Sequence, residues 1–326
     1  MSENLISILR GAVSGALLGL CAASAAAAAD YPKPGQKLTV VVPWDAGGGV
    51  DVSMRLLQPA LAKELGMPVQ IVNMPGGGSQ AGLTRCMAAA PDGYTLCATS
   101  LPSTNLTYLI PERKAPYKRE SFVPVATFAF EFGSILVTKD SPYKTVSDLV
   151  DDARKQPGKI RIGNAGRYTN AHIDLLSFER ATGVSVAPVF FSGGAPGVTA
   201  LLGHHIEALS STPSNYMGQY KSGDVRVLAV MADEPSALLP GVPTFASAGY
   251  KVNGFTTRTL SLPPGVPADI AAKVEGAIRR AVNTPEFQRQ LAGLGAEFRY
   301  MDGAQSADLW KRTDADLTAL LAREAK

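Results

Sequence analysis

The chain has 326 residues, of which 46% are hydrophobic, and its 31 basic and 28 acidic residues leave a net charge of +3. The charges are interspersed, so no basic stripe indicates a nucleic-acid partner, and after residue 29 no apolar run has the length of a membrane span. This length exceeds one ordinary core and fits two α/β lobes.

The first residues have the pattern of a secretory signal peptide. An apolar segment at 12–22 follows Arg10 and precedes the small-residue run at 22–29, and it is too short to span a bilayer. We therefore expect residues 1–29 to direct export to the periplasm, with cleavage before Asp30. Lipidation at Cys21 is the second reading, because Leu20 stands where lipoprotein signals place a small residue.

Export would place the two remaining cysteines, Cys86 and Cys97, in an oxidising compartment. They lie on a predicted helix and on the following strand, and the turn at 91–93 can bring them together as a disulfide. Two buried free thiols are the alternative. The sequence leaves both open.

The first part of the chain predicts strands that alternate with helices. Strands are expected at 38–43, 69–73 and 94–98, and helices at 50–65 and from the loop 74–82 to about 90. This order favours a parallel sheet, in which ligands bind beyond the carboxyl ends of the strands.

Two glycine-rich loops, 43–51 and 74–82, each lead from a strand into a helix, and the third strand ends at Thr99 and Ser100. The unpaired N–H groups of a helix start suit a carboxylate or phosphate, and glycine lets the anion approach the backbone. For loop 43–51 alone, a tight turn with Asp51 capping the helix is an equally good interpretation.

After residue 117 come two short apolar strands, and a second β/α series begins from there. The expected strands are 122–128, 134–138, 159–163, 186–189, 206–209 and 225–230, with 129–133 separating the first two; the expected helices are 146–154, 171–181, 195–202 and 215–221. Small and hydroxyl-bearing residues stand at the helix starts, as in the first series.

The C-terminal part has too little sheet to stand alone. A strand at 255–262 and helices at 267–282, 285–293 and 304–324 are expected to return to the first lobe. The chain then crosses between lobes near 128–133 and near 253–257, which makes a hinge with a cleft. We assign 30–130 and 255–326 to lobe 1 and 131–254 to lobe 2.

Catalytic and metal-binding patterns are scarce. The three histidines, His172, His204 and His205, lack metal-ligand spacing, and Ser79 stands in no closed nucleophile elbow. Gly76, Gly78 and Ala81 formally fit a dinucleotide fingerprint, but the matching acid would be Asp92, which falls inside a turn. We therefore expect no metal, no cofactor and no enzyme activity, and keep a dinucleotide-binding enzyme as a remote alternative.

Several motifs in order give the chain a family resemblance. They are Val42-Pro43-Trp44-Asp45-Ala46-Gly47-Gly48-Gly49-Val50-Asp51, Val72-Asn73-Met74-Pro75-Gly76-Gly77-Gly78, Ala90-Pro91-Asp92-Gly93-Tyr94-Thr95-Leu96, Gly194-Ala195-Pro196, Val225-Arg226-Val227-Leu228-Ala229-Val230 and Pro240-Gly241-Val242-Pro243-Thr244. Together they resemble the Bug-type substrate-binding proteins of tripartite tricarboxylate transporters over essentially the whole mature chain.

The resemblance implies a two-lobed periplasmic-binding-protein-like α/β fold of type II, with a sheet in each lobe and a two-crossing, Venus-flytrap hinge. It implies a monomeric receptor that binds a small organic acid or amino acid and delivers it to membrane permease subunits; a ligand-presenting partner of a sensor is the alternative. The ligand-binding residues it points to are Trp44, Asp45, Gly47, Gly48, Gly49, Gly77, Gly78, Ser79, Asn164, Tyr168, Thr169, Asn170, His172, Gly193, Gly194 and Ala195, and we add Ser100.

Two departures from the family pattern bear on the ligand. Asp45 places a negative charge beside the expected carboxylate site, so it either points to solvent or pairs with a cationic group of the ligand. Arg258 stands where the family tends to be apolar or aromatic, and lies either on the surface or in the cleft, where it would bind a carboxylate. His172 either holds its loop or is a structural core histidine, and Trp44 is expected to form a cleft wall.

Overall fold

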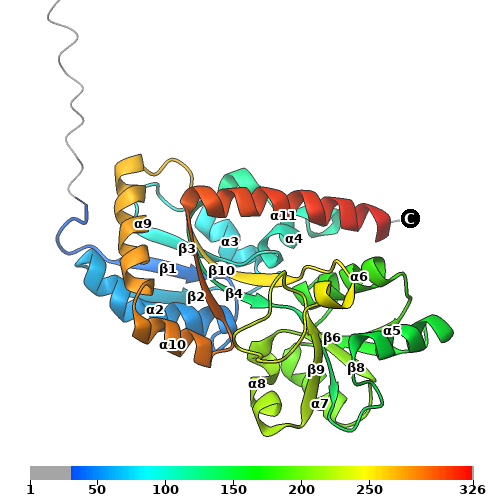
Figure 1. The fold of residues 1–326 in the computed structure, drawn as a ribbon. Helices are drawn as coiled ribbons and strands as arrows, with labels where there is room; N and C mark the ends of the chain where they lie inside the picture. The colour runs from blue at the N-terminus through cyan, green and yellow to red at the C-terminus, as the bar shows by residue number, and fades with distance from the viewer. Residues whose placement is uncertain (1–30, 325–326) are drawn as a thin grey trace, which may run out of the picture. The chain divides into compact units, whose positions relative to one another are not determined.

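The structure is a computed structural model that describes residues 31–324. The predicted signal peptide and its lipidation alternative at Cys21 lie outside the described residues. The remainder forms a mixed α/β fold with one sheet in each of two lobes, as expected for the two-lobed class (Figure 1). Among residues 31–324, no helix combines the length and apolar character that a membrane span requires.

The first sheet has six strands in the order β11-β4-β10-β3-β1-β2. Its strands are β1 (Leu38–Val42), β2 (Val69–Asn73), β3 (Thr95–Thr99), β4 (Val123–Phe132), β10 (Phe255–Leu262) and β11 (Glu297–Asp302). β1 pairs in parallel with β2 and β3, which confirms the predicted parallel arrangement, whereas β10 runs antiparallel to β3 and β4. The C-terminal strands thus complete the sheet that the N-terminal strands begin.

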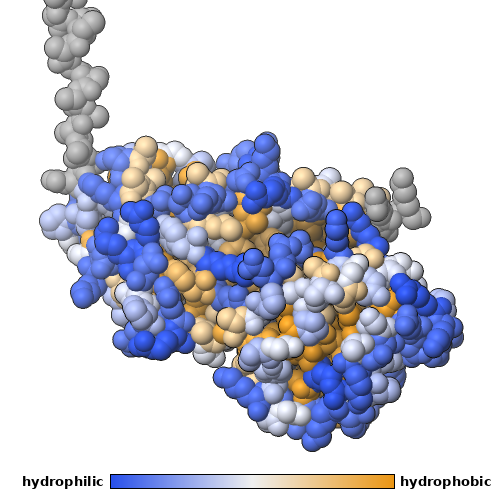
Figure 2. Space-filling model, in the orientation of Figure 1, coloured by the Kyte–Doolittle hydropathy of each residue, from blue (hydrophilic) through white to orange (hydrophobic). Residues whose placement is uncertain are grey.

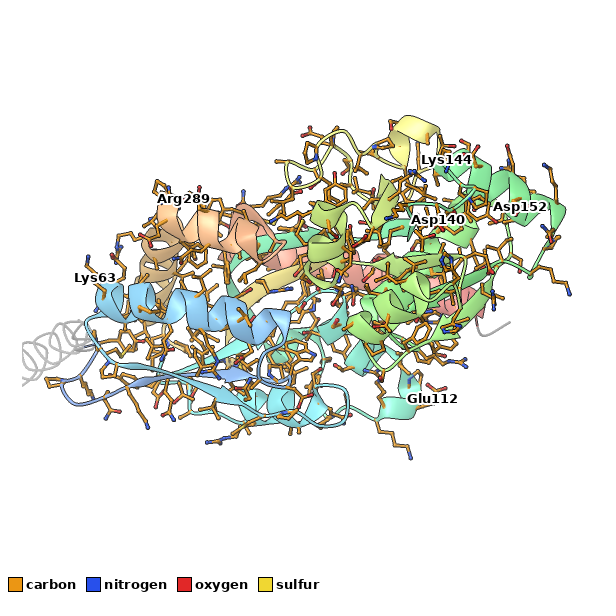
Figure 3. The ribbon with its side chains drawn as sticks, turned by 90° about the horizontal axis from the view of Figure 1, so that it is seen from below. Lys63, Glu112, Asp140, Lys144, Asp152 and Arg289 are labelled. Atoms are coloured by element: carbon orange, nitrogen blue, oxygen red, sulfur yellow. A yellow bond between two sulfur atoms is a disulfide. The ribbon has the colours of Figure 1, made fainter. Side chains whose placement is uncertain are left out.

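Helices cover both faces of this sheet. They are α2 (Gly49–Leu65), α3 (Gln80–Met87), α4 (Ser103–Leu109), α9 (Ala268–Val282), α10 (Pro285–Gly293) and α11 (Gly303–Glu324), with the short turns η1 (Pro111–Arg113) and η2 (Arg119–Ser121). α2 packs with α9 and α10, and α4 packs with α11. Figure 3 shows α2 beside α10, marked by Lys63 and Arg289.

The sequence reading was wrong at three places in this lobe. β4 is one strand through Phe132, not a strand followed by a separator at 129–133, because Ala129 and Phe130 pair with both β10 and β11. Helix α4 was missed, since Ser103, Thr104 and Asn105 give it no amphipathic pattern. Strand β11 was also missed, and it occupies an edge of the sheet.

The second sheet has five strands in the order β7-β6-β8-β5-β9. Its strands are β5 (Ser134–Thr138), β6 (Arg161–Asn164), β7 (Ala187–Phe190), β8 (Ala208–Ser211) and β9 (Val225–Val230). Its helices are α5 (Val146–Lys155), α6 (Asn170–Thr182), α7 (Gly194–Leu202) and α8 (Pro213–Ser222), and η3 is Ala246–Ala248. One apolar core includes residues of α5 and α6, and a second includes residues of α7 and α8.

The two crossings between the sheets are hydrogen-bonded to one another. Gly133 separates β4 from β5, and Gly254 immediately precedes β10. The Gly133 N–H donates to Gly254 O at 2.8 Å, the Gly254 N–H to Met231 O at 3.0 Å, and the Met231 N–H to Gly133 O at 2.8 Å. The lobe boundaries at 130/131 and 254/255 remain a prediction.

Cys86 on α3 and Cys97 on β3 are both fully buried and are joined by a disulfide. Of the two alternatives that the sequence leaves open, the structure has the bridged form. On the face shown in Figure 2, hydrophilic residues cover much of both lobes, and hydrophobic residues are visible on the second lobe around β9.

Candidate functional site

The strand order places the predicted loops at the facing ends of the two sheets. β4 and β10 lead to the crossings in the first sheet, and β5 leads away from one in the second. The carboxyl ends of β1, β2 and β3 therefore lie toward the second lobe, and those of β6, β7 and β8 toward the first. A cavity of about 560 Å³ between the lobes is lined by Gly47, Gly48 and Gly49 on one side and by Ser214 and Asn215 on the other.

Loop one, residues 43–48, is fixed by Asp51. The Asp51 carboxylate accepts the Gly47 N–H at 2.8 Å, Arg55 Nε at 2.9 Å and Asn73 Nδ2 at 2.9 Å, and Asn73 also donates to Trp44 O at 3.1 Å. Burial would raise the pKa of Asp51, but these hydrogen bonds outweigh it and hold the pKa below its ordinary 3.8. Gly48 is the N-cap of α2, so Asp51 is not the capping residue but stabilises the turn from within the helix.

The predicted site residues of loop one and of the start of α2 differ in exposure. Trp44 is half-buried, whereas Asp45, Gly47, Gly48 and Gly49 are exposed. Asp45 makes no ion pair within residues 31–324, so this part of the chain supplies no counter-charge for it. Gly48 and Gly49, at the start of α2, line the cavity, and the first N–H groups of a helix lack intrahelical acceptors.

Loop two, residues 74–79, has four consecutive residues with positive φ: Gly76 at 130°, Gly77 at 58°, Gly78 at 63° and Ser79 at 84°. Glycine adopts this left-handed backbone without strain, but serine does so rarely. Ser79 is the N-cap of α3 and is 2% exposed, and its Oγ has no hydrogen-bond partner in the described part of the chain, residues 31–324. A buried hydroxyl without a partner costs free energy unless a ligand or water satisfies it.

Arg113 lies over loop two and was missed by the sequence reading. A Cβ at Gly78 would stand 3.2 Å from Arg113 Nη1 and 3.6 Å from its Cζ, so the guanidinium packs against the loop. Arg113 is half-buried and has no ion pair among the described residues, and burial lowers its pKa. It belongs to η1, beside Glu112, which is labelled in Figure 3. No motif in the sequence marks this short turn.

Ser100, at the end of β3, is 2% exposed and its Oγ lies 2.8 Å from Thr256 Oγ1. The Leu101 N–H donates to Thr257 Oγ1 at 3.0 Å. These bonds tie the third strand end to β10. The Ser100 hydroxyl therefore has a partner within the first lobe.

In the second lobe, the loop between β6 and α6 is held by its own side chains. Asn164 Oδ1 accepts the Gly166 N–H at 3.0 Å, while its buried Nδ2 has no acceptor among the residues that the structure describes. Tyr168, at φ 57°, donates its N–H to His172 Nδ1 at 3.1 Å, and Thr169 caps α6 by accepting from the His172 N–H at 3.4 Å. Asn170 begins the helix.

His172 is 6% exposed, and its ring contacts those of Tyr168 and Phe190, with centroids 5.9 and 5.0 Å apart. Burial, together with the nearby positive charge of Arg167, lowers the pKa of His172 to about 4. A neutral imidazole that accepts the Tyr168 N–H holds the loop. Phe190 is 43% exposed beside it.

The loop between β7 and α7 contains the predicted Gly193, which is the N-cap of α7. A Cβ at Gly194 would collide with the Asn215 side chain, so glycine permits α7 and α8 to approach closely. Ala195 is exposed in the first turn of α7.

Arg258 is 5% exposed and lines the cavity between the lobes, so the surface reading is wrong. It forms an ion pair with Glu131, which is 2% exposed, and its Nε donates to Gly49 O at 3.3 Å. Ser214 of the second lobe donates to Glu131 Oε2 at 2.5 Å. The Arg258 guanidinium is therefore already paired with the Glu131 carboxylate. The sequence pattern does not predict this pair, because it places 129–133 between two strands.

The arrangement offers donors rather than a catalytic constellation. Within residues 31–324 there is no group of three or more His, Cys, Asp or Glu that could hold a metal ion. Within the same residues Ser79 Oγ has no hydrogen bond to a base, and Asp92, the acid that a dinucleotide site would need, accepts the Tyr94 N–H at 3.0 Å within its turn. Main-chain N–H groups, one buried hydroxyl and an unpaired guanidinium suit an anionic ligand.

Comparison with known proteins finds relatives that match most of this chain. A UPF0065 protein of Cupriavidus necator is 30% identical over 302 residues, which cover 93% of this chain and 91% of that protein. BugT of Bordetella pertussis is 29% identical over 287 residues, which cover 86% and 88% of the two chains.

Solved structures show the same fold. A TctC solute-binding protein from Polaromonas, without ligand, has a TM-score of 0.78 at 26% identity, covering 89% of this chain and 99% of that one. MatC from Rhodopseudomonas palustris with bound malate has a TM-score of 0.74 at 28% identity, covering 88% and 99%. Residues 53–323 match the tripartite tricarboxylate transporter family receptor, TctC. The chain therefore belongs to the TctC family of tripartite tricarboxylate transporter receptors, as its Bug-type motifs predict.

Proposed function

We propose that this chain is a periplasmic receptor that binds a small dicarboxylate between its lobes and delivers it to the permease of a tripartite tricarboxylate transporter. Proteins of this family and fold bind solutes and are not enzymes, which supports a receptor without catalytic activity. Residues 1–29 would act as the signal peptide that directs export, and the receptor with its bound ligand is expected to be a monomer.

The observation that carries the proposal is the pairing of Arg113 with loop two. The guanidinium has no ion pair among the described residues, and it packs on Gly78 next to the buried, unpartnered Ser79 hydroxyl. A carboxylate placed there would receive a charge-assisted hydrogen bond together with main-chain donors. Loop two and the start of α2 then anchor one carboxylate.

The second lobe supports an acid at the other end of the ligand. Arg167 is exposed, makes no ion pair within residues 31–324, and stacks on Tyr168 with its Cζ 5.1 Å from the ring centroid. It belongs to the loop that faces the first lobe. Asp45, which would suit an amino group, is exposed to solvent, and MatC was solved with malate. These features favour a plain diacid over an amino acid.

The test is calorimetry on protein stripped of co-purified ligand by denaturation and refolding. Malate, succinate and glutarate are compared with acetate and with aspartate. Ligand at 100 times its dissociation constant adds about 2.7 kcal/mol to the unfolding free energy, which thermal unfolding detects. If no diacid binds, the proposed ligand class is wrong; if aspartate binds best, the amino-acid alternative replaces it.

Arg113→Gln tests the anchor. We expect it to weaken diacid binding by about tenfold or more, because a charge-assisted hydrogen bond is lost, while the unfolding free energy changes little. Arg289→Gln is the matched control, since Arg289 is exposed on α10. If the two variants bind the diacid with equal affinity, loop two is not part of the ligand-binding site.

A further inference from the structure

A carboxyl group without a hydrogen-bond partner is buried where the two lobes join. Asp174 lies on α6 and is 2% exposed, and its Oδ2 has no partner among residues 31–324. Burying an ionised carboxylate without a counter-charge or donors is strongly unfavourable. Such a group is either kept neutral or satisfied by something that the protein itself does not supply.

The N–H groups of the two glycines that contact this carboxyl do not satisfy it. A Cβ at Gly133 or at Gly254 would collide with the Asp174 carboxyl, so the missing side chains of both glycines make room for it. The N–H groups of these glycines already donate to Gly254 O and Met231 O, at 2.8 and 3.0 Å. The carboxyl therefore rests against two crossings whose donors are used elsewhere.

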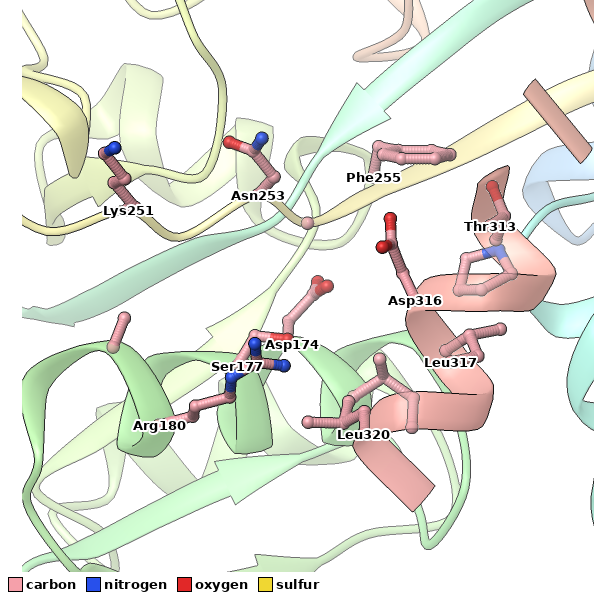
Figure 4. A pocket seen from close by; sticks show the side chains of 14 residues that line it. Asp174, Ser177, Arg180, Lys251, Asn253, Phe255, Thr313, Asp316, Leu317 and Leu320 are labelled. Atoms are coloured by element: carbon pink, nitrogen blue, oxygen red, sulfur yellow. The ribbon is translucent and has the colours of Figure 1, made fainter. Parts of the chain in front are cut away.

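Asp174 also lines a cavity of about 340 Å³ that is separate from the residues of the predicted carboxylate site. Its apolar wall comes from Ile173 on α6, Leu317 and Leu320 on α11, and Phe255 on β10. Figure 4 shows Asp174 and Asp316 directed from α6 and α11 toward the space beside Phe255, and Gly254 lines the same cavity. Both lobes thus contribute to one small chamber with acidic and apolar walls.

Two basic residues, Arg180 and Lys251, line the same cavity and are exposed. In Figure 4 they lie on the side away from Asp316. Neither forms an ion pair among the described residues, so Asp174 has no cationic partner there. Burial raises the pKa of Asp174 well above its ordinary value, in agreement with a missing counter-charge.

We propose that this cavity is a second ligand site, which binds a small organic cation with an ammonium group on a short apolar stem. The ammonium lies between Asp174 and Asp316, and the stem packs on Leu317, Leu320 and Ile173. An ammonium supplies the counter-charge and the hydrogen-bond donors that Asp174 lacks. A metal ion is a poorer fit, because no group of three or more potential metal ligands is present within residues 31–324.

The cavity has walls from both lobes, so its occupant bridges them. A bound amine is expected to stabilise the lobe arrangement in which the cavity exists. The effect does not depend on the proposed carboxylate site, which uses other residues.

The experiment uses the mature chain and n-butylammonium, with the isosteric alcohol 1-butanol as ligand control. Thermal unfolding and calorimetry at constant ionic strength should show saturable binding of the amine and none of the alcohol. Asp174→Asn prevents the side chain from ionising beside the bound ammonium, with little change in shape, so we expect a loss of about tenfold or more in amine affinity. Asp151→Asn, in an exposed pair with Arg154 on α5, should bind the amine as the wild type does.

A second variant guards against misfolding of the first. Ser177→Phe places a ring in the cavity from its half-buried side and should also abolish amine binding. Unchanged amine affinity in both variants, or equal binding of 1-butanol, would overturn the proposal. Gly48→Val should retain amine binding whether or not it binds diacids, so failure of this site and failure of the carboxylate site are distinguishable.

Discussion

Arg258 and Glu131 form a buried ion pair between β10 and β4, next to the crossings of the chain between the lobes. Arg258 also donates to Gly49 O of the first lobe, and Glu131 accepts from Ser214 of the second. The pair therefore connects the start of α2, the central strands and the start of α8. Removing one partner of this pair would leave the other as a buried charge without a counter-charge, which lowers the stability of the fold.

Arg258→Ala should lower the unfolding free energy by about 3–5 kcal/mol, because Glu131 would remain buried without its counter-charge. Urea denaturation measures this loss. The double variant Arg258→Met/Glu131→Leu should recover most of it, since no buried charge is then left. Arg289→Ala, at an exposed position on α10, should change stability by roughly 0.5 kcal/mol or less. A loss no greater than this control would show that the pair contributes nothing.

Gly48→Val should remove carboxylate binding and leave the fold intact. A Cβ at Gly48 meets only Asp45 O, at 3.4 Å, and the φ of −71° is open to any residue, so the backbone tolerates the change. The valine would project into the cavity where the ligand is expected to approach the start of α2. Calorimetry with a binding diacid and circular dichroism check the two halves of this prediction. Unchanged affinity would exclude loop one.

Asp51→Asn should reduce stability at neutral pH but not at low pH. The folded protein holds the Asp51 pKa below 3.8, so the ionised group stabilises the fold above that pH and the contribution disappears as the pH falls through the lowered value. We expect a loss of about 1–3 kcal/mol at pH 7, and stabilities that converge as the pH falls below the lowered pKa of Asp51. Asp308→Asn, exposed on α11, is the control. A constant difference between wild type and Asp51→Asn across this range would contradict the assignment.

Removing the disulfide with Cys86→Ala/Cys97→Ala should cost about 2–4 kcal/mol, through the unfolded chain and through two small cavities in the core. Both residues are fully buried and pack with Leu83 and Trp310. Urea denaturation with and without reductant separates the two effects, because reductant should destabilise only the wild type. If reductant does not change the unfolding transition of the wild type, the predicted contribution of the disulfide to stability is wrong.

Most strands and helices follow from local patterns. The predicted bounds of β2, β9, β10 and α10 coincide with the observed ones, because apolar runs there are bounded by glycine, proline or polar residues. The end of β4 could not be found this way. Glu131 resembles a loop residue until its partner Arg258, 127 residues later, is known to neutralise it.

The candidate site divides in the same way. The glycine loops and the Thr169 cap could be predicted from the sequence, because their backbone conformations require particular residues. Arg113 does not, since a single arginine in a surface turn is unremarkable until the fold places it on Gly78. Asp174 likewise lies in a helix with no special sequence pattern. Its burial could not be predicted, because it depends on the packing of Gly133 and Gly254 against its carboxyl group.

The hydrogen bonds among Gly133, Met231 and Gly254 limit how the lobes can move. Each crossing is tied to the other within one or two residues of the point where it leaves its sheet, so neither can slide along its neighbour without breaking them. These hydrogen bonds therefore oppose a translation of one lobe relative to the other. A rotation of the lobes about Gly133, Met231 and Gly254 is still allowed. Distances between probes on the two lobes should then change in proportion to their separation from Gly133, which distinguishes a pivot from a shear.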